Sequence, residues 1–336
     1  EDFMQGCGGS RDVRYGVWCS DDADWIEICM QRYSNKFLPR FGNPPYSRSH
    51  DDSKRRIPKT IHQIWIGGKL PEKFSSLQKE WISHHPADEG WKHYLWDDES
   101  ITEEFSSRPM FNADRYASAT NYGEKSDILR LEVLNRFGGI YVDVDFKCIR
   151  CLEDILETGV AFFAGLSNVG YIEVNNGLIG SIPGHRLLKD CLKHLHESST
   201  MPSDTLFCTL SSGNETICKT GPGFFTRRMM SAWREKSCRD DGEEEIEWII
   251  LPVRYFYSLA NSNGSFDQNL QTIQDLKECH PQVHAIHLWA HSWEEQETTQ
   301  KVQPATTSQQ DVIWLANLVT ANGWMPGAMS RSTHKK

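Results

Sequence analysis

The chain has 336 residues, of which 38% are hydrophobic and 24% are charged, and its formal net charge is −10. This composition is ordinary for a globular protein and allows one large α/β domain with an appendage, or two modest domains. The acidic balance disfavours a nucleic-acid partner, and no segment reaches the roughly 18 uninterrupted apolar residues of a membrane span. Because the sequence starts at Glu1 and not at Met, a signal or membrane anchor outside it stays open.

Two regions are expected along the chain. Residues 1–55 lack clear periodicity, carry Cys7, Cys19 and Cys29 and end in turn-prone residues, so we expect a stem or cap. Residues 56–330 alternate between strand-like and helical patterns, as in a single layered domain.

The bounds of these elements follow from apolar spacing and from Gly, Pro and Asp residues that begin or end them. The expected strands are 60–66, 91–96, 140–146, 160–166, 176–181, 247–252 and 283–290. The expected helices are 71–84, one opened by Asp97 and Asp98, 121–137, 184–197, 222–234 and 309–321. Such alternation predicts an α/β fold with a largely parallel sheet flanked by helices.

The helix at 121–137 has the clearest signals of the chain. Asn121 and Glu124 form a capping box at its start, and Gly138-Gly139 ends it. Within it, Asp127 and Arg130 are three residues apart and face the same side. They are either a simple intrahelical ion pair or, with Ser126, a site that hydrogen-bonds sugar hydroxyls and phosphate oxygens.

The strand that follows carries two acids, Asp143 and Asp145, within an apolar run. On a strand, both carboxylates project from one face, with Cα atoms roughly 6.6 Å apart. Two hard oxygen ligands suit Mg²⁺ or Mn²⁺ that keeps open positions for phosphates. An isolated D-x-D is a weak signal and often a solvated edge, but acids in an apolar strand need a partner, and a metal is a good one.

Cysteines and glycosylation sequons bear on the compartment. The chain has 10 cysteines, and Cys208 and Cys218 bracket a polar loop with the sequon at Asn214, while Asn263 begins a second sequon. Together they favour an oxidising lumen of the secretory pathway, or secretion, over the cytoplasm, with a Cys208–Cys218 disulfide. Two free thiols in a cytosolic enzyme is the alternative.

Two other patterns are discounted as metal sites. Cys148 and Cys151 form a single C-x-x-C without a second pair, so a disulfide or two packed thiols is favoured over zinc. His287 and His291 have helical spacing but lack the Glu of a zinc-protease motif.

Several motifs, in the same order along the chain, resemble those of a known family. The strings Ser126-Asp127-Ile128-Leu129-Arg130 and Gly138-Gly139-Ile140-Tyr141-Val142-Asp143-Val144-Asp145 resemble the DXD sugar-binding region of glycosyltransferase family 32. That family includes fungal mannosyltransferases that act on inositol phosphorylceramide and bacterial capsule-type enzymes, and the chain is also similar to the catalytic domain of the clostridial glucosylating toxins. Further segments that resemble the family's blocks are 61–68, 175–177, 220–223 and 287–293.

The resemblance implies a GT-A-like (Rossmann-like) domain that transfers a sugar from a UDP- or GDP-sugar with retention of configuration. Trp65 would stack on the base, Asp127 and Arg130 would hold the donor sugar, and Asp143 would contact ribose, sugar and, through water, the metal. Asp145 would ligate Mn²⁺ or Mg²⁺ directly, with His287 as a candidate ligand. The other donor-binding residues would be Ile64, Ser126, Tyr141, Ser292 and Trp293. His291 stands where the family often has Gly.

Two rival functions remain open on the sequence: an inactive, lectin-like protein that binds nucleotide sugar or glycan, and a secreted effector that glycosylates host proteins. The intact motif residues favour an enzyme, and no delivery module is recognised in this sequence. The sequence does not reveal the sugar, the nucleotide, or whether the acceptor is glycan, lipid or protein.

Overall fold

The structure is a computed structural model. It describes residues 22–41, 56–119, 121–169, 172–197, 215–234, 247–259, 273–274, 276, 278 and 280–290. Several predictions lie outside these residues: those on Cys7, Cys19, Cys208, Asn214, Asn263, His291, Ser292, Trp293 and the helix at 309–321.

Within the described residues, six strands form the main sheet, in the order β2-β1-β3-β6-β5-β7. Their bounds are β1 Thr60–Ile64, β2 Lys92–Trp96, β3 Gly139–Val142, β5 Phe162–Leu166, β6 Val174–Ser181 and β7 Ile249–Leu251. β6 is antiparallel to β3 and β5, while the β1–β2, β1–β3 and β5–β7 pairs are parallel. The predicted fold class, a mixed and mostly parallel sheet flanked by helices, is confirmed.

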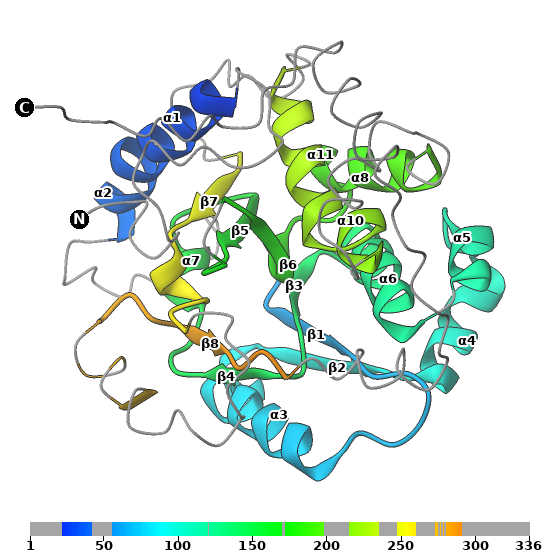
Figure 1. Cartoon of the computed structure of the whole chain (residues 1–336). Helices are drawn as coiled ribbons and strands as arrows, with labels where there is room; N and C mark the ends of the chain where they lie inside the picture. The colour runs from blue at the N-terminus through cyan, green and yellow to red at the C-terminus, as the bar shows by residue number, and fades with distance from the viewer. Residues whose placement is uncertain are drawn as a thin grey trace, which may run out of the picture.

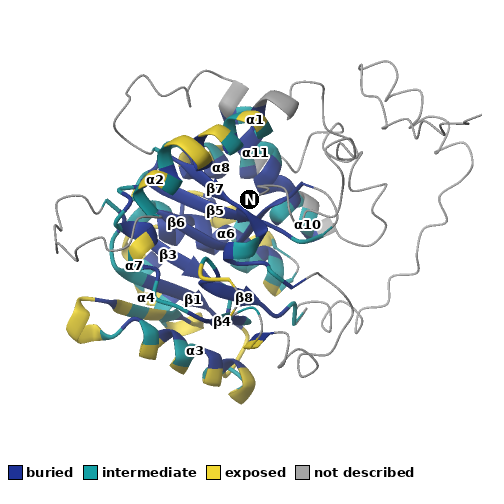
Figure 2. Cartoon of the chain, turned by 90° about the vertical axis from the view of Figure 1, so that its left-hand side faces the viewer, coloured by how far each residue is buried: buried dark blue, intermediate teal, exposed yellow. Residues whose placement is uncertain are grey.

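Helices cover this sheet (Figure 1). Their bounds are α3 Glu72–His84, α4 Asp98–Ser107, α5 Ala113–Ser118, α6 Tyr122–Phe137, α7 Glu153–Leu156, α8 Arg186–Glu197, α10 Glu215–Lys219 and α11 Pro222–Arg234. α6, α8 and α11 pack together, and α11 lies against β6. Most strands of the sheet are buried, except β2, of which only Trp96 is buried, and the outer side of α3 is exposed (Figure 2). Among the described helices none is long and apolar enough to cross a membrane.

One predicted element is wrong in a way that matters for the site. The strand expected at 140–146 ends at Val142, and a new strand, β4 (Phe146–Cys148), pairs with β8 (Ala285–His287) in a second sheet. Asp143–Asp145 is a turn, closed by a 3.2 Å hydrogen bond from the Phe146 N–H to the Asp143 carbonyl. The apolar alternation continues across this turn because the two strands are buried in different sheets.

The passage from α6 into β3 depends on Gly138 and Gly139, which have φ of 64° and 96°. A Cβ on Gly139 would lie 2.6 Å from the carbonyl oxygen of Thr60 on β1. Only glycine therefore lets the chain reverse here and pair with β1 at once. At the other end of α6, the structure shows one half of the predicted capping box. The Asn121 side chain accepts from the Glu124 N–H at 2.8 Å, while the Glu124 carboxylate contacts Arg115 at 2.7 Å.

The N-terminal segment contains helices that its sequence did not predict. α1 (Asp22–Arg32), a π-helix η1 (Tyr33–Phe37) and α2 (Leu38–Phe41) run without a break. Its buried hydrophobic residues recur every fourth position, at Trp25, Cys29, Tyr33 and Phe37. A four-residue repeat drifts around an α-helix of 3.6 residues per turn, and a wider π turn brings it back to the core. Among the described cysteines, Cys29, Cys148, Cys151 and Cys191 are free thiols.

Candidate active site

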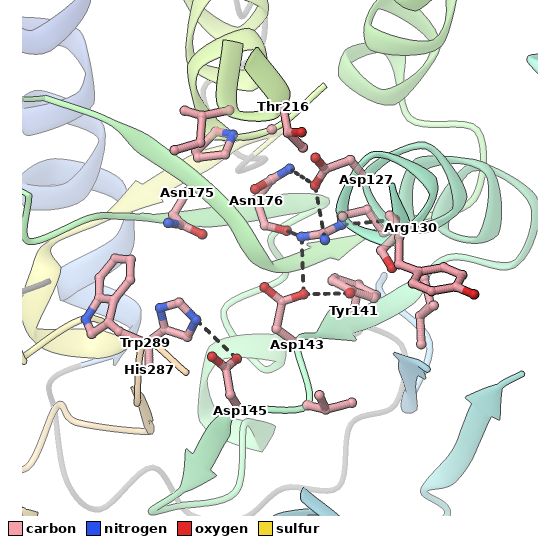
Figure 3. Close-up of a pocket in the computed structure, with 18 of the residues that line it drawn as sticks. Asp127, Arg130, Tyr141, Asp143, Asp145, Asn175, Asn176, Thr216, His287 and Trp289 are labelled. Carbon is pink, nitrogen blue, oxygen red and sulfur yellow. Dashed lines mark hydrogen bonds and ion pairs between the residues drawn. The ribbon is translucent and has the colours of Figure 1, made fainter. Parts of the chain in front are cut away.

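A pocket lies at the carboxyl ends of the parallel strands β1 and β3, the place where α/β sheets bind ligands. Its lining comes from the end of β1, the first turns of α6, the β3–β4 turn, β6, the α10–α11 segment and the end of β8 (Figure 3). Ligand pockets with a few converging polar groups are the usual sites of binding or catalysis.

Arg130 is the centre of the first cluster in this pocket. Its guanidinium, 6% exposed, donates to the carbonyl oxygens of Ser126 and Asn176 at 3.2 and 2.8 Å. It also pairs with Asp127 at 3.1 Å and with Asp143 at 3.3 Å. The cation lies 4.5 Å from the ring centre of Tyr141. Arg130 is therefore fixed by groups on α6, β3 and β6, and it ties two carboxylates together.

Asp127 is buried and already has partners on both carboxylate oxygens. Oδ1 accepts from the Asn176 amide at 2.8 Å, and Oδ2 accepts from the Thr220 hydroxyl at 2.9 Å. Burial raises the pKa of Asp127 to about 6, although Arg130, Thr220 and Asn176 all act to lower it. The carboxylate is thus held in one orientation, with its charge compensated inside the protein.

Asp143 links this cluster to the second one. Its side chain is 27% exposed, far more than that of Arg130, and its Oδ1 accepts from the Tyr141 hydroxyl at 2.6 Å. Burial raises the pKa of Asp143, a change that Arg130 opposes and Asp145 reinforces. A Cβ on Gly177 would lie 2.7 Å from Asp143 Oδ2, so any larger residue at this point of β6 would displace the acid.

Asp145 and His287 complete the second cluster. The backbone pairing of Phe146 with His287 in β4–β8 sets His287 Nε2 3.2 Å from Asp145 Oδ1. Asp145 Oδ2 accepts from the Ala290 N–H at 2.9 Å. Burial acts to raise the pKa of Asp145, but the charge and hydrogen bond of His287 outweigh it and lower the pKa.

The residues Asp143, Asp145 and His287 fit a divalent cation. Their ligand atoms lie within 4.8 Å of one another, two of them belong to carboxylates of like charge, and His287 Nδ1 is buried without a hydrogen-bond partner in the described part of the chain. Carboxylate oxygens with one imidazole suit Mn²⁺ or Mg²⁺. The ligand residues of the expected DXD-type metal site are therefore in place, and they suit either of the two ions.

The aromatic residue predicted to stack on a base lies at the end of β1. Trp65 lines the pocket with Ile64, and its ring contacts Phe74 at a centroid distance of 5.4 Å. Tyr122, at the start of α6 and 38% exposed, also lines the pocket. A Cβ on Gly67 would meet the Tyr122 ring at 2.3 Å, so glycine after β1 makes room for it.

Most residues of the predicted site therefore meet in one pocket. Those that line it are Ile64, Trp65, Ser126, Asp127, Arg130, Tyr141, Asp143, Asp145 and His287, while Ser292 and Trp293 lie outside the described residues. The predicted site lacked Tyr122, Glu173 and Trp289, which also line the pocket. Trp289 lay inside a motif block, but nothing in the local pattern marks Tyr122 or Glu173.

Comparison with known proteins identifies the motif region. Residues 71–161 match the family model described as a glycosyltransferase sugar-binding region containing a DXD motif. This segment includes α6, β3 and both aspartates of the turn. The resemblance inferred from the motifs is confirmed, and it supports an enzyme of the glycosyltransferase type.

Curated relatives extend the match beyond this region. The chain is 28% identical over 206 residues to inositol phosphoceramide mannosyltransferase 3 of Schizosaccharomyces pombe, covering 61% of this chain and 53% of the relative. It is 30% identical over 256 residues to mannosyl phosphorylinositol ceramide synthase CSH1 of Saccharomyces cerevisiae, covering 72% of this chain and 62% of the relative. The chain thus spans between half and two thirds of these relatives. A solved structure, the PaToxG glycosyltransferase, aligns with a TM-score of 0.40 and 18% identity, covering 63% of this chain and 77% of that one.

Proposed function

We propose that this chain, whose residues 71–161 carry a glycosyltransferase sugar-binding region, is a retaining glycosyltransferase. It would use a divalent metal to move a sugar from a UDP- or GDP-sugar to a hydroxyl acceptor. One observation carries the proposal: the acid pair Asp143–Asp145 with His287, suited to a metal, opens into the same pocket as the fixed Asp127–Arg130 pair.

The roles proposed for the residues follow from their contacts. Trp65 stacks on the nucleotide base at one end of the pocket. Asp127, held by Asn176 and Thr220, accepts hydrogen bonds from the donor sugar. Arg130 holds Asp127 and Asp143 in position and adds positive charge beside the leaving diphosphate. Ser292 and Trp293 are proposed, on the resemblance alone, to lie near the diphosphate.

Asp145 and His287 would hold the metal, with Asp143 contacting it through water. Bound there, a Mn²⁺ or Mg²⁺ ion supplies Lewis-acid stabilisation of the charge that develops on the leaving diphosphate. The sugar C1–phosphate oxygen bond breaks and the C1–acceptor oxygen bond forms on the same face, while the leaving phosphate takes the acceptor proton. No double-displacement nucleophile is assigned.

The names of the relatives suggest the substrates. Both yeast relatives are named for mannosyl transfer to inositol phosphoceramide. We propose mannose as the first donor sugar to test, with a lipid-linked polyol as acceptor, ahead of glycan or protein acceptors. From the pattern of the sequence, we also propose a catalytic domain at 56–330 and a stem or cap at 1–55.

Donor hydrolysis tests the enzymatic proposal. Purified protein is incubated with GDP-mannose, UDP-glucose, UDP-galactose or UDP-N-acetylglucosamine, with Mn²⁺ or with chelator, and the released nucleoside diphosphate is measured. Metal-dependent release from one donor is expected. Binding of a nucleotide sugar without release or transfer would favour the inactive, lectin-like alternative.

A compartment of the secretory pathway is proposed from the cysteines and sequons alone. A Cys208–Cys218 bridge would close a loop of about ten residues and stabilise the fold by somewhat under about 3 kcal/mol. Peptide mapping of non-reduced protein decides this point. Alkylatable thiols at both positions in natively expressed protein would contradict the bridge and weaken the lumenal assignment.

A further inference from the structure

The N-terminal segment carries a row of aromatic side chains that the proposed chemistry does not use. Tyr33 and Phe37 belong to the π-helix η1, and Phe41 ends α2. Neighbouring rings of this aromatic row stack, with centroid distances of 5.9 Å from Tyr33 to Phe37 and 5.1 Å from Phe37 to Phe41. A four-residue repeat drifts around a regular α-helix, and the π turn corrects this drift, so the three rings stay on one face. Single π turns are often found at functional sites.

All three rings pack against one core residue, Tyr255. It ends the 3₁₀ helix η4 (Val253–Tyr255) and is fully buried. The ring centroids of the aromatic row lie 6.1, 6.0 and 5.6 Å from that of Tyr255, at interplanar angles of 86°, 75° and 62°. The hydroxyls of Tyr33 and Tyr255 are also 3.2 Å apart. Edge-to-face contacts of this kind are favourable, so the N-terminal segment holds Tyr255 in one position.

Tyr255 in turn contacts the residue that precedes β8, His284. Their rings are stacked, 5.9 Å apart and within 7° of parallel, and the His284 N–H donates to the Tyr255 carbonyl oxygen at 3.0 Å. Phe41 also contacts the His284 ring directly, at a centroid distance of 5.7 Å. The aromatic row therefore reaches the start of β8 both directly and through Tyr255.

A second hydrogen bond from the same segment fixes His287 at the end of β8. Phe256, the residue after η4, accepts from the His287 N–H at 3.0 Å. On β4, Phe146 pairs with His287, and the two rings stack at 4.5 Å. Two segments thus set the position of His287, and a shift of Phe256 would change the 3.2 Å separation of His287 Nε2 from Asp145 Oδ1.

The imidazole of His287 depends on this support more than a metal ligand usually does. A histidine that binds a metal through one ring nitrogen ordinarily donates a hydrogen bond from the other, which fixes the orientation of the ring. His287 Nδ1 is buried and has no hydrogen-bond partner within the described part of the chain. Packing and the backbone of β8 must therefore orient the ring.

We propose that the aromatic row positions His287 for the divalent metal, acting through Tyr255 and Phe256. This inference rests on the metal site of the proposed function. It gives residues 22–41 the role of a cap that supports the site, although none of them lines the pocket. The π turn is then part of this support, because it keeps the row on the face that meets Tyr255.

Mn²⁺ binding to variants of the full chain tests this role. Phe41→Leu is the main variant, because Phe41 is only partly buried and contacts both Tyr255 and His284. Phe41→Tyr keeps the ring. Cys29→Ala is the control, since it removes a buried side chain from α1 of the same segment, which packs on β7 and α11. Free Mn²⁺ is measured by electron paramagnetic resonance without donor, and urea unfolding gives the stability of each variant.

We expect Phe41→Leu to weaken Mn²⁺ binding about tenfold, the lower end of the loss known for groups that orient a metal ligand. Phe41→Tyr should bind Mn²⁺ as wild type does. Cys29→Ala should stay within about twofold of wild type even if it loses as much stability, because distant sites act independently.

Unchanged Mn²⁺ affinity in Phe41→Leu would overturn the positioning role, and so would an equal loss of affinity in Cys29→Ala, since affinity would then follow stability alone. If Phe41→Leu does not fold, Tyr33→Phe decides the question, because it removes only the hydroxyl contact to Tyr255. Weaker Mn²⁺ binding by Tyr33→Phe would support the role, and unchanged binding would overturn it. A wild-type protein that binds no Mn²⁺ would instead count against the metal site of the proposed function.

Discussion

The two clusters of the pocket differ in how far they are complete without ligand. In the first, both oxygens of Asp127 accept hydrogen bonds and Arg130 pairs with two acids. In the second, the ligand atoms of two carboxylates of like charge and one imidazole lie within 4.8 Å of one another. The first cluster should therefore contribute to folding, and the second should contribute mainly once a cation binds.

Removing Arg130 should produce the largest effect and should test the first cluster. Arg130→Met leaves Asp127 and Asp143 without their shared cation, and breaking a buried pair in this way costs about 3–5 kcal/mol of unfolding free energy. Denaturant unfolding measures it. Arg136→Met is the control on the same helix, since Arg136 pairs with the more exposed Glu104 and should cost less. Equal losses of unfolding free energy in the two variants would contradict a larger contribution of the first cluster to stability.

Asp145→Asn should separate activity from stability in the second cluster. Loss of a carboxylate ligand should lower metal-dependent transfer by about 100-fold or more, whereas the unfolding temperature should change little, because like charge is removed beside Asp143. Asp154→Asn is the matched control, because Asp154 also contacts a histidine, His284 at 3.3 Å, but is 56% exposed. Activity of Asp145→Asn within a few-fold of wild type at saturating Mn²⁺ would contradict the metal assignment.

Trp65→Ala tests a residue that belongs to neither cluster. Nucleotide affinity should fall by about 1–3 kcal/mol, the range for a lost stacking contact with a base. Calorimetry with UDP and with GDP measures the loss, and Trp65→Phe should restore part of it. If both nucleotides bind as tightly to Trp65→Ala as to wild type, Trp65 only packs against Phe74.

The smallest expected effect comes from Thr220→Val, which removes one hydrogen bond to Asp127. Because burial raises the pKa of Asp127 to about 6, this carboxyl stabilises the fold most at low pH, and that stability is lost as pH rises through about 6. Losing the Thr220 hydroxyl should raise this pKa further and cost about 1.5 kcal/mol at pH 7, less at pH 5. Urea unfolding from pH 4.5 to 8 measures the difference. A cost that is independent of pH would mean that Asp127 does not titrate in this range.

The sequence identified the parts of the site that lie close together in the chain. Asp127 and Arg130 meet because three residues are nearly one helical turn, and Gly138-Gly139 ends the helix where a glycine is required. The periodic segments gave α3, α6, α8 and α11 and the strands of the main sheet, because a buried face imposes its spacing on the residues that form it.

The tertiary structure decided the rest. His287 reaches Asp145 only because β8 pairs with β4, where Phe146 faces His287, 141 residues further along the chain. No local pattern encodes this pairing.

 The local pattern predicts a strand through Asp143–Asp145 where the structure has a turn, since apolar alternation is the same whether the next strand joins this sheet or another.

The positions of Glu173, Tyr122 and the N-terminal helix also depend on contacts between distant segments. Glu173, next to the start of β6, lines the pocket, and Tyr122 lines it where Gly67 makes room for its ring. The buried repeat of Trp25, Cys29, Tyr33 and Phe37 drifts gradually around a regular α-helix, and the π turn at Tyr33–Phe37 keeps it facing the core. Spacing within about one turn or one strand is set by backbone geometry, whereas contacts between distant segments depend on which surfaces pack together, and only the folded chain decides that.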